Sequence, residues 1–369
     1  MNSRCQPIAD VRDHWARCRW KRGWKPIAGV VAAALFVAVT PATADSPPPP
    51  GSQGPALTAA SQDELDAAIH CDWADTTGAH EPVLLVNGTA LTREEYWYWN
   101  YKPGLLQRGF DVCTLDQLRS LRDAQVTTEY VVNAIRRVNQ WTGRKVGVIG
   151  HSQGTLHPRA AVKYWPDIQK RVDDVVLMSG PAHGTSQANV ILTAIGGFPA
   201  SWQFRVGSKY IRALNNPDET PGDTPPGNVS WTVIYSKTDE LVQPGVFNPT
   251  APIAGGTNIA IQDICPLDTT THVSMLINPV AFDAVLDALT HPGPALVSRF
   301  VKPNECLQGP GFAGSNPAAL PVIVAAEVLS QDLELPPFQW CIDPLWALTG
   351  MGDSACEPPL KPYAVPYLP

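Results

Sequence analysis

From residue 81 onward, short apolar runs alternate with segments of helical periodicity, and this alternation restricts the fold more than any other feature of the chain. Strands are expected within residues 82–86, 107–114, 145–149, 172–178, 230–235 and 257–262. Helices are expected over residues 127–141, 155–165 and 280–289. Strands that alternate with helices favour a mostly parallel central sheet flanked by helices. The sequence therefore predicts an α/β fold.

One strand-to-helix junction has the sequence Gly-His-Ser-Gln-Gly, residues 150–154. The pattern alone decides little, because glycines on both sides of a serine occur by chance in a chain with 28 glycines. Between a strand and a helix, however, the two glycines allow a sharp turn that exposes the serine hydroxyl above the sheet. Such a turn is the nucleophile elbow of the α/β-hydrolase fold. Ser152 is therefore the expected nucleophile.

A nucleophilic serine needs a base, and the base needs an acid to fix its tautomer. In this fold the acid and then the histidine follow the serine along the chain. The histidines after Ser152 are His157, His183, His272 and His291. His157 lies on the helix of the elbow, and His183 follows the next strand too closely to leave room for an acid. His272 lies in a loop after the last strand and is preferred. His291 ends a helix, where histidine commonly faces the helix dipole, and is the alternative.

The acid is expected in a loop at the carboxyl edge of the sheet. Asp239 fits this position, because it follows the strand at 230–235 directly. Glu240, Asp263 and Asp268 lie nearby in the sequence and are the alternatives, although each is also a typical solvated loop carboxylate. The sequence thus predicts a triad of Ser152, Asp239 and His272.

Acyl transfer also needs hydrogen-bond donors for the oxyanion of the tetrahedral intermediate. The backbone N–H of Gln153, the residue after the nucleophile, is the first expected donor. The second is expected in the loop after an early strand, where Gly88 and Thr89 follow residues 82–86. The Thr89 hydroxyl would add a donor there. The alternative interpretation of Gly88 and Thr89 is an ordinary turn.

The first 44 residues have the three parts of a secretory signal: a basic stretch, 13 apolar residues at 27–39, and the ending Ala-Thr-Ala at 42–44. A short membrane anchor is the alternative, but 13 residues fall below the roughly 20 that span a bilayer. The proline-rich residues 45–55 are expected to be a linker without fold of its own. Residues 56–369 are expected to form a single catalytic domain, secreted and monomeric.

The expected mature chain is strongly acidic. Residues 1–44 hold seven of the 27 basic and two of the 34 acidic residues, which leaves 20 basic and 32 acidic residues and a net charge of −12. Such a balance argues against nucleic acid or an anionic membrane as the main partner. The expected partner is a small-molecule or lipid ester, with transient contact to a lipid surface. The chemistry needs neither metal nor cofactor.

Six cysteines remain after residue 44: Cys71, Cys113, Cys265, Cys306, Cys341 and Cys356. An even number in an exported chain without a Cys-x-x-Cys motif favours disulfides over a metal site. Six cysteines allow 15 pairings, of which the sequential one is the simplest, and free buried thiols are the alternative.

Several segments resemble the secreted lipase B family of the Candida antarctica type, from about residue 56 to the end of the chain. They are "VLLVNGT", "TTEYVVNAI", "HSQG", "YSKTDELVQP" and "CEPPLKPYAVPY". The resemblance implies a lipase or esterase of the α/β-hydrolase fold, and it supports sequential disulfides. It also places Ser152, Asp239 and His272 in the triad, and Thr89 and Gln153 in the oxyanion hole.

Two positions depart from the family's pattern. His151 stands where the family's pattern has a tryptophan that bounds the alcohol pocket, and Pro181 replaces an acidic residue near the active site. His151 is therefore expected to line a wider and more polar pocket, or else to bond the backbone under the elbow. Selectivity does not carry over from the family.

Other function classes share the fold. A polyester or cutin hydrolase, an acyltransferase and a peptidase all use an acyl-enzyme, and a binding module with an inactive triad is the non-enzymatic alternative. The apolar stretches 188–202 and 318–329 are either buried core or the rim of an acyl-chain channel. An apolar rim would favour lipidic esters over peptides.

Overall fold

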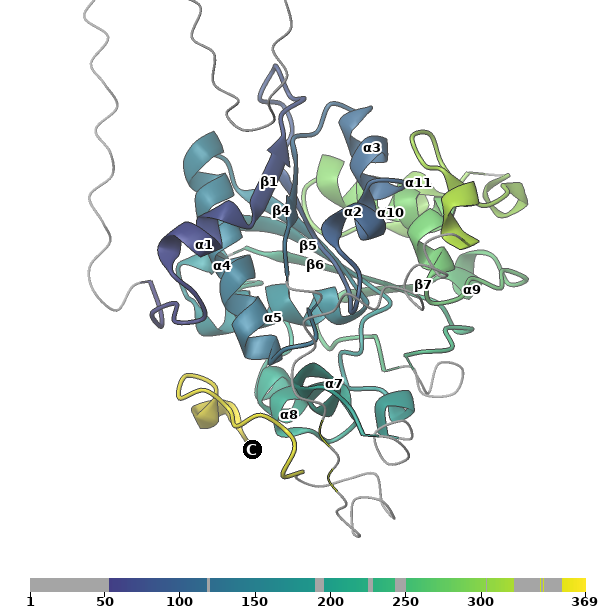
Figure 1. The fold of residues 1–369 in the computed structure, drawn as a ribbon. Helices are drawn as coiled ribbons and strands as arrows, with labels where there is room; N and C mark the ends of the chain where they lie inside the picture. Colours follow the sequence, from purple (N-terminus) through teal and green to yellow (C-terminus); the bar gives the residue numbers. More distant parts are fainter. Residues whose placement is uncertain are drawn as a thin grey trace, which may run out of the picture. The chain divides into compact units, whose positions relative to one another are not determined.

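The computed structural model describes residues 53–117, 120–189, 196–224, 228–242, 250–302, 304–321, 339, 341 and 354–369. Within them a seven-stranded sheet runs in the order β1-β3-β2-β4-β5-β6-β7 (Figure 1). Its strands are β1 Ile69–Asp72, β2 Val83–Val86, β3 Val112–Leu115, β4 Val146–His151, β5 Val172–Met178, β6 Ser230–Tyr235 and β7 Thr257–Ala260. All pairs are parallel except β1 with β3, so the predicted mostly parallel sheet is confirmed.

The antiparallel edge strand β1 was not predicted. Three of its residues are partly buried and Asp72 is exposed, so they show no apolar run of the kind that marks the central strands. A disulfide between Cys71 and Cys113 joins β1 to β3 at directly paired positions.

The helices are α1 Gln62–Ala67, α2 Arg93–Trp97, α3 Tyr101–Leu106, α4 Ala124–Thr142, α5 Leu156–Tyr164, α7 Pro199–Phe204, α8 Lys209–Asn215, α9 Ile261–Ile264, α10 Pro279–Thr290 and α11 Val297–Phe300. The three predicted helices correspond to α4, α5 and α10. Local sequence explains their ends: α4 ends where Gly143 adopts a left-handed conformation, and α10 starts with Asn278 as N-cap before Pro279.

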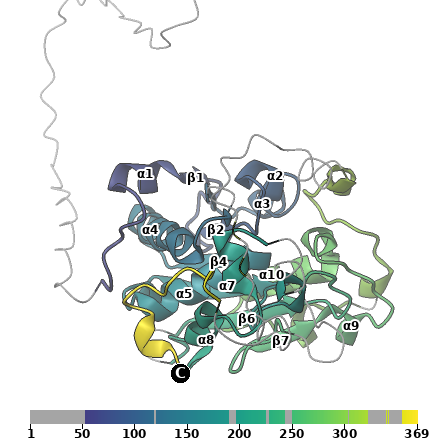
Figure 2. The ribbon, with the colours of Figure 1, turned by 60° about the horizontal axis from the view of Figure 1, so that its bottom comes forward.

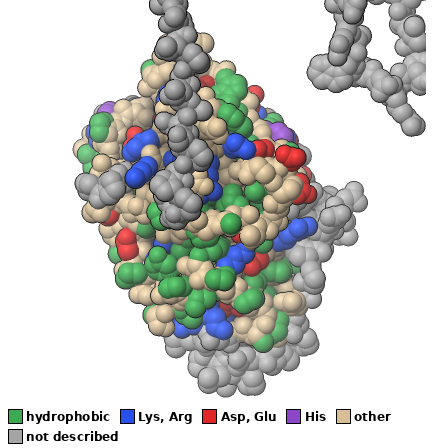
Figure 3. All heavy atoms as spheres, turned by 90° about the vertical axis from the view of Figure 1, so that its left-hand side faces the viewer, with side chains coloured by type: hydrophobic (Ala, Val, Ile, Leu, Met, Phe, Trp, Pro, Cys, Tyr) green, Lys and Arg blue, Asp and Glu red, His purple; other side chains and the backbone are tan. Residues whose placement is uncertain are grey.

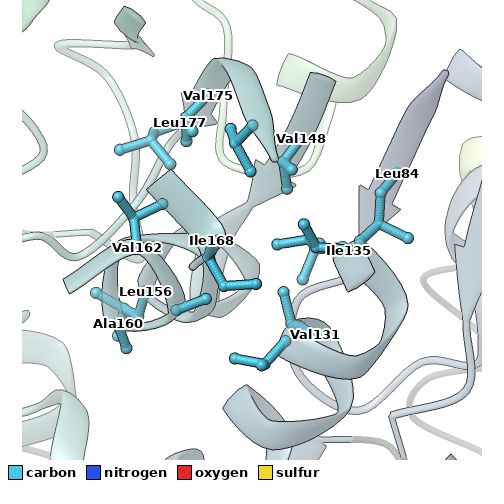
Figure 4. Close-up of a cluster of buried hydrophobic side chains, with 14 of the residues drawn as sticks. Leu84, Val131, Ile135, Val148, Leu156, Ala160, Val162, Ile168, Val175 and Leu177 are labelled. Atoms are coloured by element: carbon cyan, nitrogen blue, oxygen red, sulfur yellow. The ribbon is translucent and has the colours of Figure 1, made fainter. Parts of the chain in front are cut away.

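Alternate residues of each central strand enter two hydrophobic layers. Leu84 of β2 and Val148 of β4 pack with α4 and α5 (Figure 4), whereas Leu85 and Ile149 pack with α2, α3 and α10 on the other face. The view in Figure 2 shows α4 and α5 apart from α2, α3 and α10. Burial on both faces is why these strands read as continuous apolar runs.

One predicted strand ends earlier in the structure than the sequence analysis predicted. The expected strand at 257–262 stops at Ala260, and Ile261 begins the short helix α9. Gln262 then uses its side chain in the loop after β6, accepting from the N–H of Lys237 at 2.8 Å and donating to Ser236 Oγ at 2.8 Å. These tertiary bonds end the strand and brace the loop that carries Asp239.

The other two sequential disulfides also form, between Cys265 and Cys306 and between Cys341 and Cys356. Residues 48–369 make one compact unit. The expected end of the linker at residue 55 stays a prediction, and the last linker residues contact the fold: the Trp165 indole donates to the carbonyl oxygen of Pro55 at 2.8 Å. The predicted signal at residues 1–44 lies outside the described residues.

The molecular surface that carries α1 and α4 mixes basic, acidic and hydrophobic side chains (Figure 3). No helix within the described ranges has both the length and the apolar character that crossing a membrane requires.

The amino ends of the strands hold a buried pair of carboxyl groups. Glu81 precedes β2 and Asp174 lies in β5, and Gly147 between them on β4 has no side chain to obstruct the Glu81 carboxyl group. Burial raises the pKa of Asp174 to about 7, although the Ser230 hydroxyl donates to it. Burial and the neighbouring Asp174 also raise the pKa of Glu81 well above its ordinary value.

We expect this pair to make stability fall as the pH rises. The folded chain keeps protons that the unfolded chain has released by about pH 5, so the stabilisation is complete at low pH and is lost as the pH rises through about 7. Glu81→Gln with Asp174→Asn should therefore flatten the fall of the unfolding free energy between pH 5 and 8, to which Asp174 alone contributes about 2–3 kcal/mol, measured by urea unfolding. Asp63→Asn, at an exposed carboxylate, is the control. An unchanged pH slope in the double variant would contradict the assignment.

Candidate active site

Ser152 lies at the carboxyl end of β4, where the chain turns into the short 3₁₀ helix Ser152–Thr155 and then α5. Its φ of +56° is in the left-handed region, which non-glycine residues rarely adopt. A Cβ atom on Gly150 would overlap the Gly154 carbonyl, and one on Gly154 would overlap the Val86 carbonyl of β2. Both glycines of the motif are therefore required by close backbone approach, as expected for an elbow.

The structure brings the three predicted triad residues together. His272 Nε2 lies 2.8 Å from Ser152 Oγ, and His272 Nδ1 lies 2.8 Å from Asp239 Oδ2. An ionised carboxylate only accepts, so the imidazole proton lies on Nδ1 and Nε2 is left to accept from the serine hydroxyl. Asp239 and His272 are both buried. This is the arrangement in which a serine can be deprotonated as it attacks.

The environment of Asp239 keeps it ionised. Burial raises the pKa of the carboxyl group, but the hydrogen bond and charge of His272 and two backbone N–H groups outweigh burial, so the pKa lies below its ordinary value. Those N–H groups belong to Leu241 and Val242 and donate to Oδ1 at 2.9 and 2.8 Å. Asp239 can thus stabilise the imidazolium that forms during catalysis.

The alternative acids do not contact the His272 ring. Asp263 pairs with Lys237, and Asp268 accepts from the backbone N–H of Thr270 at 2.7 Å. Glu240 accepts from the backbone N–H of His272 at 2.8 Å, a contact that sequence reasoning missed. The only sequence indication of this contact was the position of Glu240 beside the acid.

The alternative base, His291, lies away from the serine. It is half-exposed and its Nδ1 is 3.3 Å from Asp287 on α10. The His291 side chain therefore interacts with the end of α10, as the helix-dipole argument suggested.

The two predicted oxyanion residues also lie beside the nucleophile. The Thr89 hydroxyl donates to Gln153 Oε1 at 2.7 Å, and the Gln153 amide donates to the Ser120 carbonyl at 2.8 Å. A Cβ atom on Gly88 would overlap the Tyr96 hydroxyl and approach Ser152 Cβ, so Gly88 lets its loop lie against the serine. The hydroxyl of Thr89 can turn from Gln153 toward an oxyanion.

A cavity of about 400 Å³ opens onto Ser152, His272, Thr89 and Gln153. Its apolar lining consists of Leu91, Trp99, Leu121, Pro181, Ala188, Phe198, Ala200, Phe204, Leu241, Val242, Val273 and Leu276. Part of the stretch 188–202 thus lines the cavity, through Ala188, residues 196–198, Ala200 and Ser201, whereas Trp202 is fully buried in the core. Most of the second stretch, residues 322–329, lies outside the described residues.

His151 lines the same cavity, but only 1% of its surface is exposed. Its Nδ1 lies 2.5 Å from the Tyr96 hydroxyl and its Nε2 lies 3.0 Å from the His272 carbonyl oxygen. This backbone bond reaches the loop of His272, 121 residues away in the sequence, and not the backbone under the elbow that the alternative interpretation named. Its influence on the alcohol pocket stays a prediction.

Within the described residues, one group of acidic side chains is close enough to share a cation: Glu81, Asp173 and Asp174. It lies at the amino ends of the strands, opposite the edge that carries Ser152, and Lys145 pairs with Asp173 at 3.1 Å. It has no part in the triad.

The family pattern of the class 2 lipases matches residues 80–276, a range that contains the three predicted triad residues and the two predicted oxyanion residues. The chain belongs to the class 2 lipase family. As a class 2 lipase it is an ester hydrolase, as the resemblance implied.

Two relatives agree with this assignment. This class 2 lipase is 28% identical over 348 residues to lipase B of Pseudozyma antarctica, a match that covers 92% of this chain and 94% of that protein. It is also similar to the crystal structure of Aspergillus fumigatus lipase B, with a TM-score of 0.70 and 29% identity over 86% of this chain and 77% of that one.

The triad geometry predicts that Ser152→Ala and His272→Ala each lower ester turnover by several orders of magnitude, because the triad acts as a unit. Hydrolysis of p-nitrophenyl butyrate measures the effect. His291→Ala is the matched control and should keep wild-type turnover. A damaging His291→Ala beside a harmless His272→Ala would show that the base is wrongly assigned.

Proposed function

We propose that the chain is a secreted serine hydrolase that cleaves lipidic carboxylic esters through an acyl-enzyme. The observation that carries this proposal is the unbroken line of hydrogen bonds from Asp239 through His272 to Ser152, with 2.8 Å at each step. The apolar cavity at Ser152 supports the choice of lipidic substrates, because an acyl chain can enter it without leaving polar groups unpaired.

In the first half of the reaction, Ser152 Oγ attacks the ester carbonyl carbon while its proton passes to His272 Nε2. The carbonyl π electrons move onto oxygen, and the N–H of Gln153 and the hydroxyl of Thr89 donate to this oxyanion. The intermediate then collapses. The carbon–oxygen bond to the alcohol breaks, and His272 returns the proton to the leaving alcohol.

In the second half, water replaces the alcohol. His272 takes one proton from the water as its oxygen attacks the acyl carbon, and a second tetrahedral intermediate forms in the same oxyanion hole. Its collapse breaks the bond to Ser152 Oγ, which regains the proton from His272. The acid leaves and the enzyme returns to its starting state, so only side chains, backbone N–H groups and water take part.

We infer that the enzyme works as a monomer that touches lipid surfaces transiently. One chain supplies all three triad residues, so no partner is needed to complete the site. Leu241 lines the cavity yet is 46% exposed, which suits contact between the cavity mouth and an ester-rich surface.

The ester proposal predicts a clear substrate order. A series of p-nitrophenyl esters from acetate to palmitate should be hydrolysed with highest kcat/KM at a chain longer than acetate, because each buried methylene adds about 0.8 kcal/mol of binding. The series is run beside emulsified triglyceride, a polyester film and a peptide p-nitroanilide, with Ser152→Ala as the blank. Turnover of polyester but not triglyceride would favour the polymer hydrolase, and turnover of the anilide alone would contradict the proposal.

Secretion predicts the mature terminus. Three disulfides suit an oxidising compartment, and residues 1–44 have the composition of a signal. Expressed in a secreting host, the protein in the medium should begin at Asp45 by N-terminal sequencing. Recovery in the membrane fraction with residues 27–39 retained would support the anchor instead.

A further inference from the structure

The base of the triad is held by its backbone as well as by its ring. His151 Nε2 lies 3.0 Å from the carbonyl oxygen of His272, and the Glu240 carboxylate accepts from the His272 N–H at 2.8 Å. Asp239 holds the ring itself at 2.8 Å. His272 therefore has partners on its N–H, its C=O and its Nδ1, which leaves Nε2 for the serine.

The hydrogen-bond roles of His151 follow from its two partners. A carbonyl oxygen only accepts, so His151 Nε2 carries the proton and donates to His272. Nδ1 is then an acceptor, and the Tyr96 hydroxyl 2.5 Å away donates to it. Burial and the adjacent His272 lower the pKa of His151 to about 3, so the ring stays neutral in the range where the base works. Tyr96 thus selects the tautomer that can donate to His272.

The position of His151 in the chain gives this bond its importance. His151 directly precedes Ser152, whereas His272 lies 120 residues away on a separate loop. The distance between Ser152 Oγ and His272 Nε2 depends on how the elbow and that loop are placed. The hydrogen bond from His151 to the His272 carbonyl oxygen links the elbow to that loop, beside the two reacting side chains.

We propose that His151 and Glu240 are positioning residues that hold the catalytic base by its backbone, and that Tyr96 fixes His151 in the donating tautomer. This inference rests on the proposed function of Ser152 and His272. It also explains the role of His151 at a position that departs from the family's pattern. Both ring nitrogens bond to protein atoms, so the imidazole orients the base and has no nitrogen left to bond the substrate alcohol.

The first test compares His151→Met with His151→Gln. Methionine has similar length but no donor, whereas the glutamine amide can replace Nε2–H and donate to the His272 carbonyl. His151→Met should lower kcat on the order of 10–100-fold, as a displaced catalytic group does. KM should change by less than about twofold for both ethyl and bulky secondary-alcohol esters. His151→Gln should recover most of the lost kcat, and His291→Ala serves as the unaffected control.

The second test addresses the other two contacts. Tyr96→Phe removes the donor to His151 Nδ1 and should lower kcat in the same sense, with the thermal unfolding midpoint kept. Glu240→Ala should lower kcat, whereas Glu240→Gln should retain most of it, because an amide oxygen still accepts from the His272 N–H. These variants keep the proposal testable if His151→Met fails to fold.

A readout that needs no turnover separates this inference from the proposed function. The proton between His272 Nδ1 and Asp239 should give a low-field NMR resonance in the wild type, and it should broaden in His151→Met and sharpen again in His151→Gln. Wild type without any ester turnover would overturn the proposed function alone. Turnover with an unchanged resonance and kcat in His151→Met, or a loss confined to bulky esters, would overturn the positioning role and return His151 to the pocket wall.

Discussion

The strained backbone of Ser152 is the constraint on which the active site depends. A residue other than glycine holds a φ of +56° only when its surroundings fix it. Here the surroundings are the end of β2 and the first turn after β4, pressed together where Gly150 and Gly154 have no side chains. The strain presents the hydroxyl at the carboxyl edge of the sheet, and the rest of the site is arranged around that point.

The sheet supplies the rigidity that such a turn needs. The central strands are buried on both faces, between α4 and α5 on one side and α2, α3 and α10 on the other (Figures 1 and 4). The acid and base, in contrast, lie on loops and need their own supports. The loops meet at the Thr270 carbonyl, which accepts from the hydroxyls of Ser236 at 2.5 Å and Thr238 at 2.9 Å. The Cys265–Cys306 disulfide brackets the base loop as well.

The bonds of His151 and Glu240 extend this support to the backbone of the base itself. They connect three segments distant in sequence: α2 through Tyr96, the elbow through His151, and the loop after β6 through Glu240. Hydrogen bonds of this kind resist displacement of the imidazole along several directions. A base held in this way loses little energy to reorganisation when the serine proton moves.

The sequence by itself determined the parallel sheet, the elbow and the order of Ser152, Asp239 and His272. Strands that are buried on both faces appear in the sequence as continuous apolar runs. The turn at Ser152 requires two glycines, which stand at a fixed spacing in the sequence. The partly buried strand β1, the end of β7 at Ala260 and the short helices α2 and α3 lack such periodicity. Only the tertiary structure decided that Glu240 and His151 reach the backbone of His272, and that residues from 89 to 276 share one cavity. Those contacts depend on how loops that are distant in the sequence lie relative to one another, and no local sequence pattern specifies that arrangement.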